Sequence, residues 1–142
     1  PIREAVAADI VCTLTPSRSP IIKKEWIAAG THINAVGADA PGKQELDPSI
    51  LKEAIVVVDD MKQASSSGEI NVPVQKGIYN IGEIYGTLPE LVVGKKKGRS
   101  DNKAITVFDS TGIAVEDIAV AKLLFEKAQQ TGGYPSMDLV GT

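Results

Sequence analysis

One stretch, residues 31–48, constrains the fold of this chain more than any other. It begins with an apolar run, His32–Val36, and continues as a turn-rich segment that carries a carboxylate, Asp39, and an ammonium, Lys43. Asp47-Pro48 then predicts a helix start, because Asp is favoured as the N-cap and Pro as the first helical residue. A strand, a polar loop and a helix in this order form the unit with which α/β folds build ligand sites at the carboxyl ends of strands.

Short β-branched runs alternate with helical segments along the chain. Their nearly continuous apolarity predicts strands that are buried on both faces of a parallel sheet. The predicted strands are Asp9–Thr15, His32–Val36, Ile55–Val58 and Ala104–Phe108, and the predicted helices are Pro48–Ala54, Met61–Ser67 and a long one from Ile113 to Gln130. Residues 70–84 are expected to be irregular. Strands that alternate with helices indicate an α/β fold with a mainly parallel sheet.

The charge balance argues against some classes of partner. The chain has 142 residues and a net charge of −3, which disfavours nucleic-acid and membrane-surface binding. The basic run Lys95–Arg99 is interpreted as a solvated loop, because it has no interleaved aromatic residues. No segment approaches the ~18 apolar residues of a membrane span, and no leader segment opens the sequence. The single Cys12 lies in an apolar run and is expected to be buried, which fits a reducing, cytoplasmic compartment.

Residues 37–43 match the phosphate-binding pattern G-x-x-x-x-G-K. Such a loop needs Ser or Thr after the lysine to hold Mg²⁺, and this sequence has Gln44 there. It also needs the helix to begin at the Gly-Lys pair, whereas the helix signal Asp47-Pro48 comes later. Asp39 within the loop would repel phosphate groups. The residues therefore disfavour an NTPase.

Two interpretations of Asp39 remain open on the residues alone. A carboxylate just past a strand end, among small residues, can exchange a proton with a ligand. Asp, Gly and Pro are equally expected in a simple turn for backbone reasons. Ser110 and Thr111 precede the long helix, where a hydroxyl N-cap is expected and where the same groups can hold a ligand anion. His32 lies in a strand pattern and is interpreted as structural, and no Cys/His group predicts a zinc or other metal site.

Five segments carry a resemblance to a known family: Ala8–Ser17, Gly30–Asp39, Pro41–Asp47, Gly68–Ile70 and Phe108–Gly112. In this order they resemble the ornithine cyclodeaminase/mu-crystallin family, and the archaeal-type alanine dehydrogenases within it most of all. The resemblance runs through nearly the whole chain. It implies a Rossmann domain that binds NAD or NADP, and a second domain that binds the substrate and forms a homodimer.

The resemblance also implies roles for individual residues. The implied cofactor contacts are Thr13, Val36, Gly37, Ala38, Asp39, Lys43 and Ser110. Asp39 matches the family's acid/base carboxylate beside the amino or imino carbon, and Thr111 would contact the substrate. Because mu-crystallin itself lacks this carboxylate, the cyclodeaminase, alanine dehydrogenase and cyclic-imine reductase branches are favoured.

Some family features are absent from this sequence. They are the G-x-G-x-x-G turn, the acidic residue that reads the ribose, and the N-terminal domain with its substrate-binding Lys and Arg. We therefore expect the second half of a Rossmann-type domain in residues 1–112, without its first β-α-β unit. Residues 113–142 are expected to be a long helix and a tail that return to the substrate and dimerisation domain. For the isolated chain we expect weak or no cofactor binding and no turnover.

The activity implied by the resemblance is NAD(P)-dependent chemistry at the C–N bond of a small α-amino acid or its imine, foremost alanine dehydrogenation. Reduction of pyrroline-2-carboxylate or another ketimine and ornithine cyclodeamination remain alternatives, because the discriminating residues lie in the missing domain. A non-catalytic protein that binds a dinucleotide is a further alternative.

Overall fold

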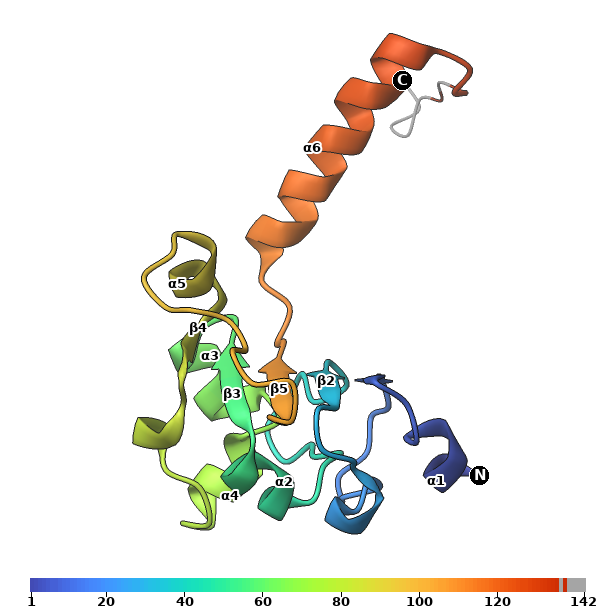
Figure 1. Ribbon diagram of the computed structural model, residues 1–142. Coiled ribbons are helices and arrows are strands. Elements are labelled where there is room, and N and C mark those ends of the chain that lie inside the picture. The colour runs from blue at the N-terminus through green and yellow to red at the C-terminus, as the bar shows by residue number, and fades with distance from the viewer. Residues whose placement is uncertain (136, 138–142) are drawn as a thin grey trace. The chain divides into compact units, whose positions relative to one another are not determined.

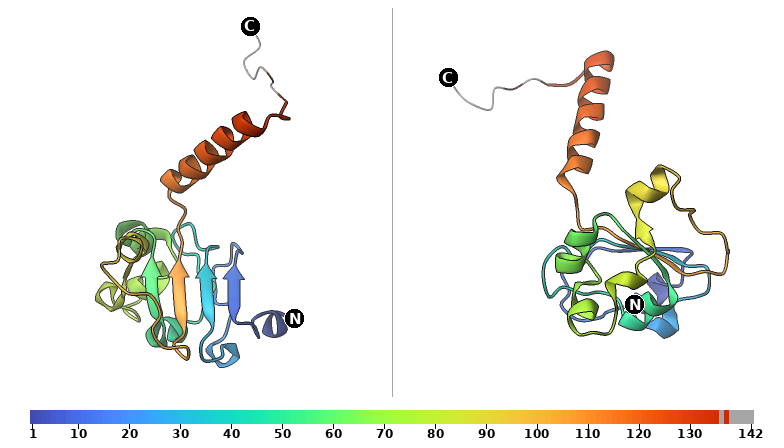
Figure 2. Two further views of the ribbon diagram at one scale, coloured as in Figure 1. Left: turned by 45° about the horizontal axis from the view of Figure 1, so that its top comes forward. Right: turned by 90° about the vertical axis from the view of Figure 1, so that its left-hand side faces the viewer.

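The computed structural model of the chain describes residues 1–135 and residue 137. Five parallel strands form one sheet in the order β1-β2-β5-β3-β4 (Figures 1 and 2). They are β1 (Ile10–Thr13), β2 (His32–Ala35), β3 (Ile55–Val58), β4 (Gly86–Thr87) and β5 (Thr106–Asp109). The predicted α/β fold with a parallel sheet is confirmed. Most of the expected C-terminal tail, residues 136 and 138–142, lies outside the described residues.

The parallel register brings the carboxyl ends of four strands into one row. Thr13 pairs with Ala35, Ala35 pairs with Asp109, and Asp109 pairs with Val58. Each of these residues is the last of its strand, so the loops that follow all start from one edge of the sheet. In α/β folds this is the edge at which ligands bind.

One face of the sheet is covered in the described part of the chain, and the other is largely open. Buried residues alternate with exposed or half-buried ones along β1, β2 and β5. In β1, Ile10 keeps 65% of its surface exposed, and Cys12 is exposed as well. The prediction of strands buried on both faces is therefore wrong for β1, β2 and β5, and Cys12 is not in the core, whereas β3 is buried on both faces at Val56, Val57 and Val58. An alternation of period two is what a sheet covered on one side produces.

Helices α2 (Pro48–Glu53), α3 (Met61–Ser67) and α4 (Asn71–Gln75) pack on the covered face. Side chains from these helices, from the connecting loops and from the strands form one hydrophobic core. Its largest fully buried aliphatic members are Ile33, Leu46, Ile50, Leu51, Val56, Val58, Ile70 and Val107. The covered face is thus the face that stabilises this part of the fold.

The start of α2 follows the sequence signal. Asp47 is the N-cap, its carboxylate accepts the N–H of Ser49 at 2.9 Å, and Pro48 is the first helical residue. A side-chain cap of this kind satisfies an N–H group that has no partner inside the helix. The helix start predicted from Asp47-Pro48 is therefore confirmed.

The structure also contains several short elements. They are α1 (Ile2–Ala5), α5 (Leu88–Val92) and 3₁₀ turns at Lys24–Trp26 and Ile81–Glu83. Residues 70–84, expected to be irregular, contain α4 despite Pro73. A proline is tolerated there because it lies in the first turn of the helix, where N–H groups lack helical partners in any case.

A groove of 380 Å³ lies on the open face of the sheet. It is bounded by Tyr85, by two leucines of α5 and by residues 97–99. The basic run Lys95–Arg99, to which these last residues belong, is a loop that is exposed except at the half-buried Lys96, whose ammonium lies 5.0 Å from the centre of the Tyr85 ring. The groove lies against the side chains of β2, β3 and β5 that point away from the core.

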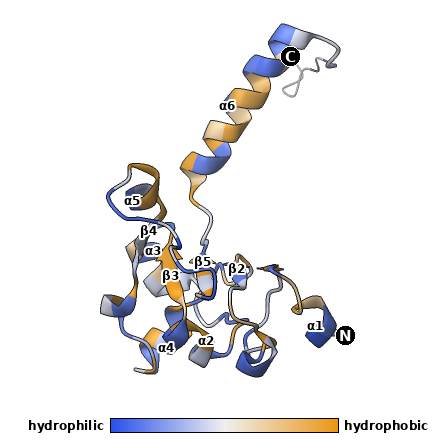
Figure 3. Ribbon diagram, viewed as in Figure 1, coloured by the Kyte–Doolittle hydropathy of each residue, from blue (hydrophilic) through white to orange (hydrophobic). Residues whose placement is uncertain are grey.

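The chain divides into two compact units, Pro1–Gly112 and Ile113–Thr142. The described element of the second unit is α6 (Ala114–Thr131), the predicted long helix. Figure 3 shows hydrophobic residues along much of α6, and five of them, Val115, Ile118, Leu123, Leu124 and Phe125, are 60% to 66% exposed. That this unit returns to a substrate domain stays a prediction. None of the helices in the described residues is long and apolar enough to cross a membrane.

Ile50→Ala is expected to lower the free energy of unfolding by about 2–5 kcal/mol, because Ile50 is fully buried and its removal leaves a cavity in the core. Val92→Ala is the matched control, since Val92 is 77% exposed, and its effect is expected to stay within about 0.5 kcal/mol. Denaturant unfolding of the two variants measures the difference. Equal effects would contradict the core described above.

Candidate functional site

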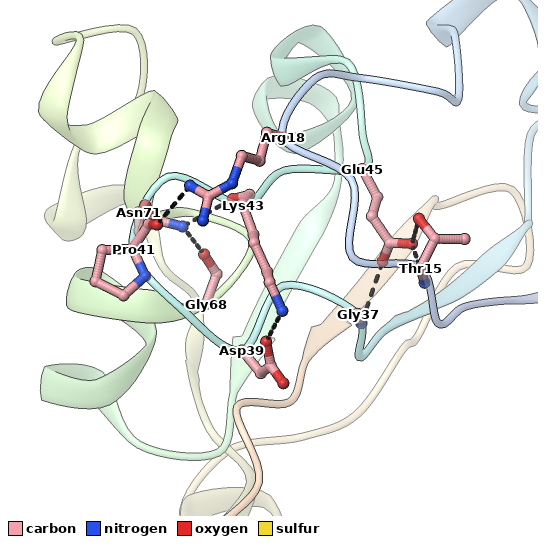
Figure 4. Close-up of polar contacts among 9 residues, drawn as sticks. All are labelled: Thr15, Arg18, Gly37, Asp39, Pro41, Lys43, Glu45, Gly68 and Asn71. Carbon is pink, nitrogen blue, oxygen red and sulfur yellow. Dashed lines mark hydrogen bonds and ion pairs between the residues drawn. The ribbon is translucent and has the colours of Figure 1, made fainter.

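Asp39 lies in the loop that follows β2, at the carboxyl edge of the sheet. We call residues 37–44 the Asp39 loop (Figure 4). The carboxylate of Asp39 forms an ion pair with the ammonium of Lys43, four residues further on. The Asp39 side chain is 60% exposed, whereas that of Lys43 is 19% exposed. The Asp39 side chain is therefore presented to solvent, whereas most of the Lys43 side chain is covered.

The ion pair sets the charge state of Asp39. The Lys43 ammonium holds the pKa of the Asp39 carboxyl below its usual range, first through its hydrogen bond and then through its charge. Asp39 is therefore a carboxylate at neutral pH, the form that can accept a proton, and while it is paired with Lys43 its proton affinity is lowered. Because the pair is exposed, water and salt screen the attraction.

Two side chains hold the backbone of the Asp39 loop at its ends. The Oε2 atom of Glu45 accepts the N–H of Gly37 at 3.1 Å. At the other end, Asn71 Oδ1 accepts the N–H of Gly42 at 3.0 Å, and Asn71 Nδ2 donates to the carbonyl of Lys43 at 2.9 Å. These contacts come from residues outside the loop, so its position relative to the sheet is defined (Figure 4).

The geometry of the loop differs from that of a phosphate-binding loop. Helix α2 begins at Pro48, so no helix N-terminus starts at the Gly42-Lys43 pair. The Gly42 N–H already donates to Asn71, and the Lys43 ammonium is paired with Asp39. A phosphate cradle needs free N–H groups and an available lysine at this place. The structure thus supports the sequence-based argument against an NTPase.

Three other predicted site residues lie along the same edge. Val36 directly follows β2 and keeps 36% of its surface exposed. Ser110 follows β5 and is half-buried, and its N–H donates to the carbonyl of Ala35 at 2.9 Å. Thr13, at the end of β1, is 4% exposed, and its hydroxyl has no hydrogen-bond partner among the described residues. An unpartnered buried hydroxyl is rare and calls for an explanation.

Thr111 does not have the expected role at the helix start. The N-cap of α6 is Ile113, with no side-chain cap, so the prediction of a hydroxyl cap from Ser110 or Thr111 is wrong. Thr111 instead donates both its N–H and its hydroxyl to the carboxylate of Asp59, with the hydroxyl at 2.9 Å. This contact joins the segment after β3 to the segment after β5.

Four buried acids shape this edge although they were not predicted as site residues: Glu45, Asp59, Glu69 and Asp109. Each accepts N–H groups of the backbone. A sequence signal exists for two of them, because Glu45 and Glu69 each directly precede a fully buried aliphatic residue. An acid inside a buried segment must find donors there, since burying it without a partner is costly.

Two of these acids have strongly altered proton affinities. Burial raises the pKa of Glu69 to about 8, although the N–H groups of Leu46 and Glu45 favour its charged form. Burial likewise raises the pKa of Asp109 to about 7, against the N–H groups of Glu69 and Ile70. Neighbouring acids add to the increase in both cases. Desolvation therefore outweighs the hydrogen bonds at both carboxyls.

The residues along the edge suit the nicotinamide end of a dinucleotide. Such a ring needs an apolar surface and hydrogen-bonding groups for its carboxamide. Val36 presents an exposed apolar side chain. Ser110 and Thr13 carry hydroxyls at the ends of β5 and β1, the strands on either side of β2, and the Thr13 hydroxyl is buried. Ala38 is fully buried, so its side chain belongs to the interior. Among the described residues, no group of three His, Cys, Asp or Glu side chains is arranged to hold a metal ion.

The family model of the ornithine cyclodeaminase/mu-crystallin family matches residues 2–132. The chain belongs to this family. Alanine dehydrogenase of Archaeoglobus fulgidus, a related protein, is 53% identical over 128 residues, which make up 90% of this chain and 40% of that protein. The resemblance stated from the sequence segments is thereby confirmed.

Solved structures of related proteins share the fold. An archaeal alanine dehydrogenase dimer with bound NAD gives a TM-score of 0.88 at 48% identity and covers 99% of this chain and 44% of that one. The Δ1-pyrroline-2-carboxylate reductase of Thermococcus litoralis, in complex with NADH and L-proline, gives 0.85 at 39% identity and covers 95% and 42%. This chain thus spans about two-fifths of the length of its relatives.

The free energy of unfolding is expected to fall as the pH rises from about 4 to about 8. The pKa of Glu69 is raised from 4.5 to about 8 and that of Asp109 from 3.8 to about 7. The folded state therefore favours the protonated acids, and this stabilisation is lost as the pH rises through the folded-state values. The expected loss is on the order of a few kcal/mol. Denaturant unfolding at closely spaced pH values measures it.

Glu69→Gln is the matched variant, since it keeps an acceptor oxygen and cannot ionise. It is expected to remove most of the slope near the upper end of this range, where Glu69 titrates. Asp39 and Glu83 act in the opposite direction, because their pKa values are lowered, and their contributions are lost only in more acidic solution. An unchanged slope in Glu69→Gln would assign the effect to another group.

Proposed function

We propose that this chain is part of an NAD-dependent oxidoreductase that acts on the C–N bond of a small α-amino acid or its imine, with alanine dehydrogenation as the first candidate. The observation that carries the proposal is Asp39, an exposed carboxylate kept ionised by Lys43 at the carboxyl edge of a parallel sheet. The family relationship supports it, because related structures contain NAD or NADH at high structural similarity.

NAD is the proposed cofactor, with NADP as the alternative, and it would accept a hydride from the amino acid or return one to the imine. The proposed contacts are Thr13, Val36, Gly37, Ala38, Asp39, Lys43 and Ser110. Val36 offers its exposed side chain, whereas Ala38 would contribute through its backbone, since its side chain is buried. The unpartnered hydroxyl of Thr13 supports a polar contact at the end of β1.

Asp39 is the proposed acid/base group. As a carboxylate it can take a proton from the substrate ammonium, or from the water that adds to the imine carbon, and return it in the reverse direction. Thr111 is the proposed substrate contact. Its hydroxyl would donate to the substrate in place of Asp59, to which it donates in this structure. We further propose that the intact protein is a cytoplasmic homodimer with no nucleic-acid or membrane partner. The related archaeal dimer supports the homodimer.

The substrate can be assigned by comparing three reactions of the intact protein. NADH with pyruvate and ammonia tests alanine formation, NADH with pyrroline-2-carboxylate tests imine reduction, and ornithine with NAD tests cyclodeamination. We expect the fastest NADH oxidation with pyruvate and ammonia. Faster reaction of the cyclic imine would assign the reductase, which the L-proline complex of a relative favours as second candidate. Ammonia release from ornithine without net change of NADH would assign the cyclodeaminase.

Asp39→Asn is expected to lower kcat by about 10²–10⁴-fold, the usual contribution of a positioned acid/base group. The dissociation constant for NAD, measured by fluorescence titration, is expected to change by less than about 3-fold, because the amide keeps the size of the carboxylate. The matched control is Asp9→Asn, since Asp9 is an exposed acid next to the amino end of β1, at the opposite edge of the sheet.

Two results would count against the proposal. Full turnover in Asp39→Asn would remove the acid/base role, and NAD binding without turnover of any of the three substrates would favour a non-catalytic dinucleotide-binding protein. For the isolated 142 residues we predict no NADH oxidation, because the sequence contains no G-x-G-x-x-G turn.

A further inference from the structure

Three buried acids connect the end of β5 to the loop that follows β2. Asp109 accepts the N–H groups of Glu69 at 2.9 Å and Ile70 at 3.2 Å. Glu69 accepts the N–H groups of Glu45 at 3.0 Å and Leu46 at 2.7 Å. The side chain of Glu45 in turn accepts the N–H of Gly37, the first residue of the Asp39 loop. All three acids are fully buried.

Glu45 joins the two loops that carry the proposed site. Its Oε1 atom accepts the N–H and the hydroxyl of Thr15, both at 2.7 Å, and its Oε2 atom accepts the N–H of Gly37 at 3.1 Å. Thr15 follows β1 and Gly37 follows β2, so one carboxylate fixes the backbone after two adjacent strands (Figure 4). This approach depends on glycine, because a Cβ at residue 37 would lie 2.5 Å from Oε2 of Glu45.

The same pairing of a glycine with a buried acid occurs at Gly68. A Cβ there would lie 2.6 Å from Oδ2 and 2.7 Å from Oδ1 of Asp109. Asp109 thereby reaches the N–H groups of Glu69 and Ile70. At both places the missing side chain leaves room for a carboxylate to accept backbone N–H groups in the interior. The position of Glu45 is in turn set by Glu69, which accepts its N–H.

Asp39 needs such support because its own ion pair does not provide it. Lys43, its partner, belongs to the same loop, so the pair does not fix Asp39 relative to the sheet. Gly37 fixes the loop relative to the sheet, since its N–H donates both to Glu45 and, at 3.0 Å, to the carbonyl of Thr13. The buried, unpartnered hydroxyl of Thr13 lies at this same strand end and points independently to a ligand there.

We infer that Glu45 is a positioning residue for Asp39: by holding Gly37 against the end of β1, it determines where the Asp39 carboxylate stands at the edge of the sheet. This inference rests on the proposed function, which gives Asp39 its role in proton transfer. A carboxylate is required because both oxygens accept N–H groups. A glutamine has one acceptor oxygen, and its NH₂ group would face the N–H of either Thr15 or Gly37.

Glu45→Gln in the intact protein is expected to lower kcat by about 10-fold or more, because small displacements of a reacting group are costly in rate. The KM values for substrate and NAD are expected to change by less than about 3-fold, since the contact acts on Asp39 and not on binding. Asp9→Asn is the control, because Asp9 is an exposed acid next to the amino end of β1, at the opposite edge of the sheet, so kcat should stay within about 3-fold.

The double variant separates positioning from a general structural effect. In the Asp39→Asn background, Glu45→Gln is expected to lower the remaining rate by less than about 2-fold, because the group that it positions is already absent. An equal loss in both backgrounds would overturn the inference. Should Glu45→Gln fail to fold, Thr15→Val removes one donor to Oε1. Thr15→Val is expected to lower kcat by a smaller factor than Glu45→Gln, and only when Asp39 is present.

Hydrogen exchange gives a readout that does not depend on activity. The backbone amides of residues 36–44 are expected to exchange faster in Glu45→Gln and at the wild-type rate in Asp9→Asn. If the wild type lacks turnover with all three substrates, the proposed function fails, whereas the exchange result still decides whether Glu45 holds this backbone. Unchanged exchange in Glu45→Gln would overturn the inference.

Discussion

Backbone N–H groups just beyond the ends of parallel strands need acceptors, and in this chain buried acids supply them. Glu45, Asp59, Glu69 and Asp109 each accept backbone N–H groups at or near the carboxyl edge of the sheet. An interior N–H group without a partner costs about as much as a lost hydrogen bond. The acids satisfy these groups and connect loops that are distant in sequence. Their desolvation opposes this gain, as the raised pKa values of Glu69 and Asp109 indicate.

The two faces of the sheet differ in burial. The covered face is aliphatic, whereas the open face combines apolar side chains with a group of polar contacts on β2 and β5. On the open face, His32 contacts the hydroxyl of Thr106 at 2.7 Å and the side-chain oxygen of Asn34 at 3.2 Å. The interpretation of His32 as structural agrees with these contacts. The loops at the carboxyl edge of the sheet are held by acids that are buried on the covered side.

Local signals predicted a large part of the fold. The bounds of β3 and α3 and the start of α2 agree with the sequence, because β-branched runs and capping residues act within a few positions. The two-residue β4 was not predicted, since so short a strand has no pattern of its own. Burial on both faces holds for β3 but was wrong for β1, β2 and β5, because apolarity in a strand does not reveal what covers each side, as the exposed Ile10 demonstrates.

The candidate site was predictable in part, because some of its signals also lie within a few positions of one another. Asp39 could be placed from the strand and loop signals around it. The partners of the buried acids could not, because most of their contacts join residues far apart in sequence, 30 positions for Thr15 and Glu45 and 40 for Glu69 and Asp109. Nothing local specifies such pairs. The same holds for Thr111, whose partner Asp59 lies 52 positions away.

The ion pair between Lys43 and Asp39 has a further consequence through thermodynamic linkage. Since the ammonium lowers the pKa of the carboxyl, any anionic group of a ligand that draws Lys43 away raises the affinity of Asp39 for a proton. Linkage is reciprocal, so a proton on Asp39 strengthens the binding of that anion by the same factor. The Asp39 loop therefore couples the arrival of negative charge to proton uptake within a single turn of the backbone.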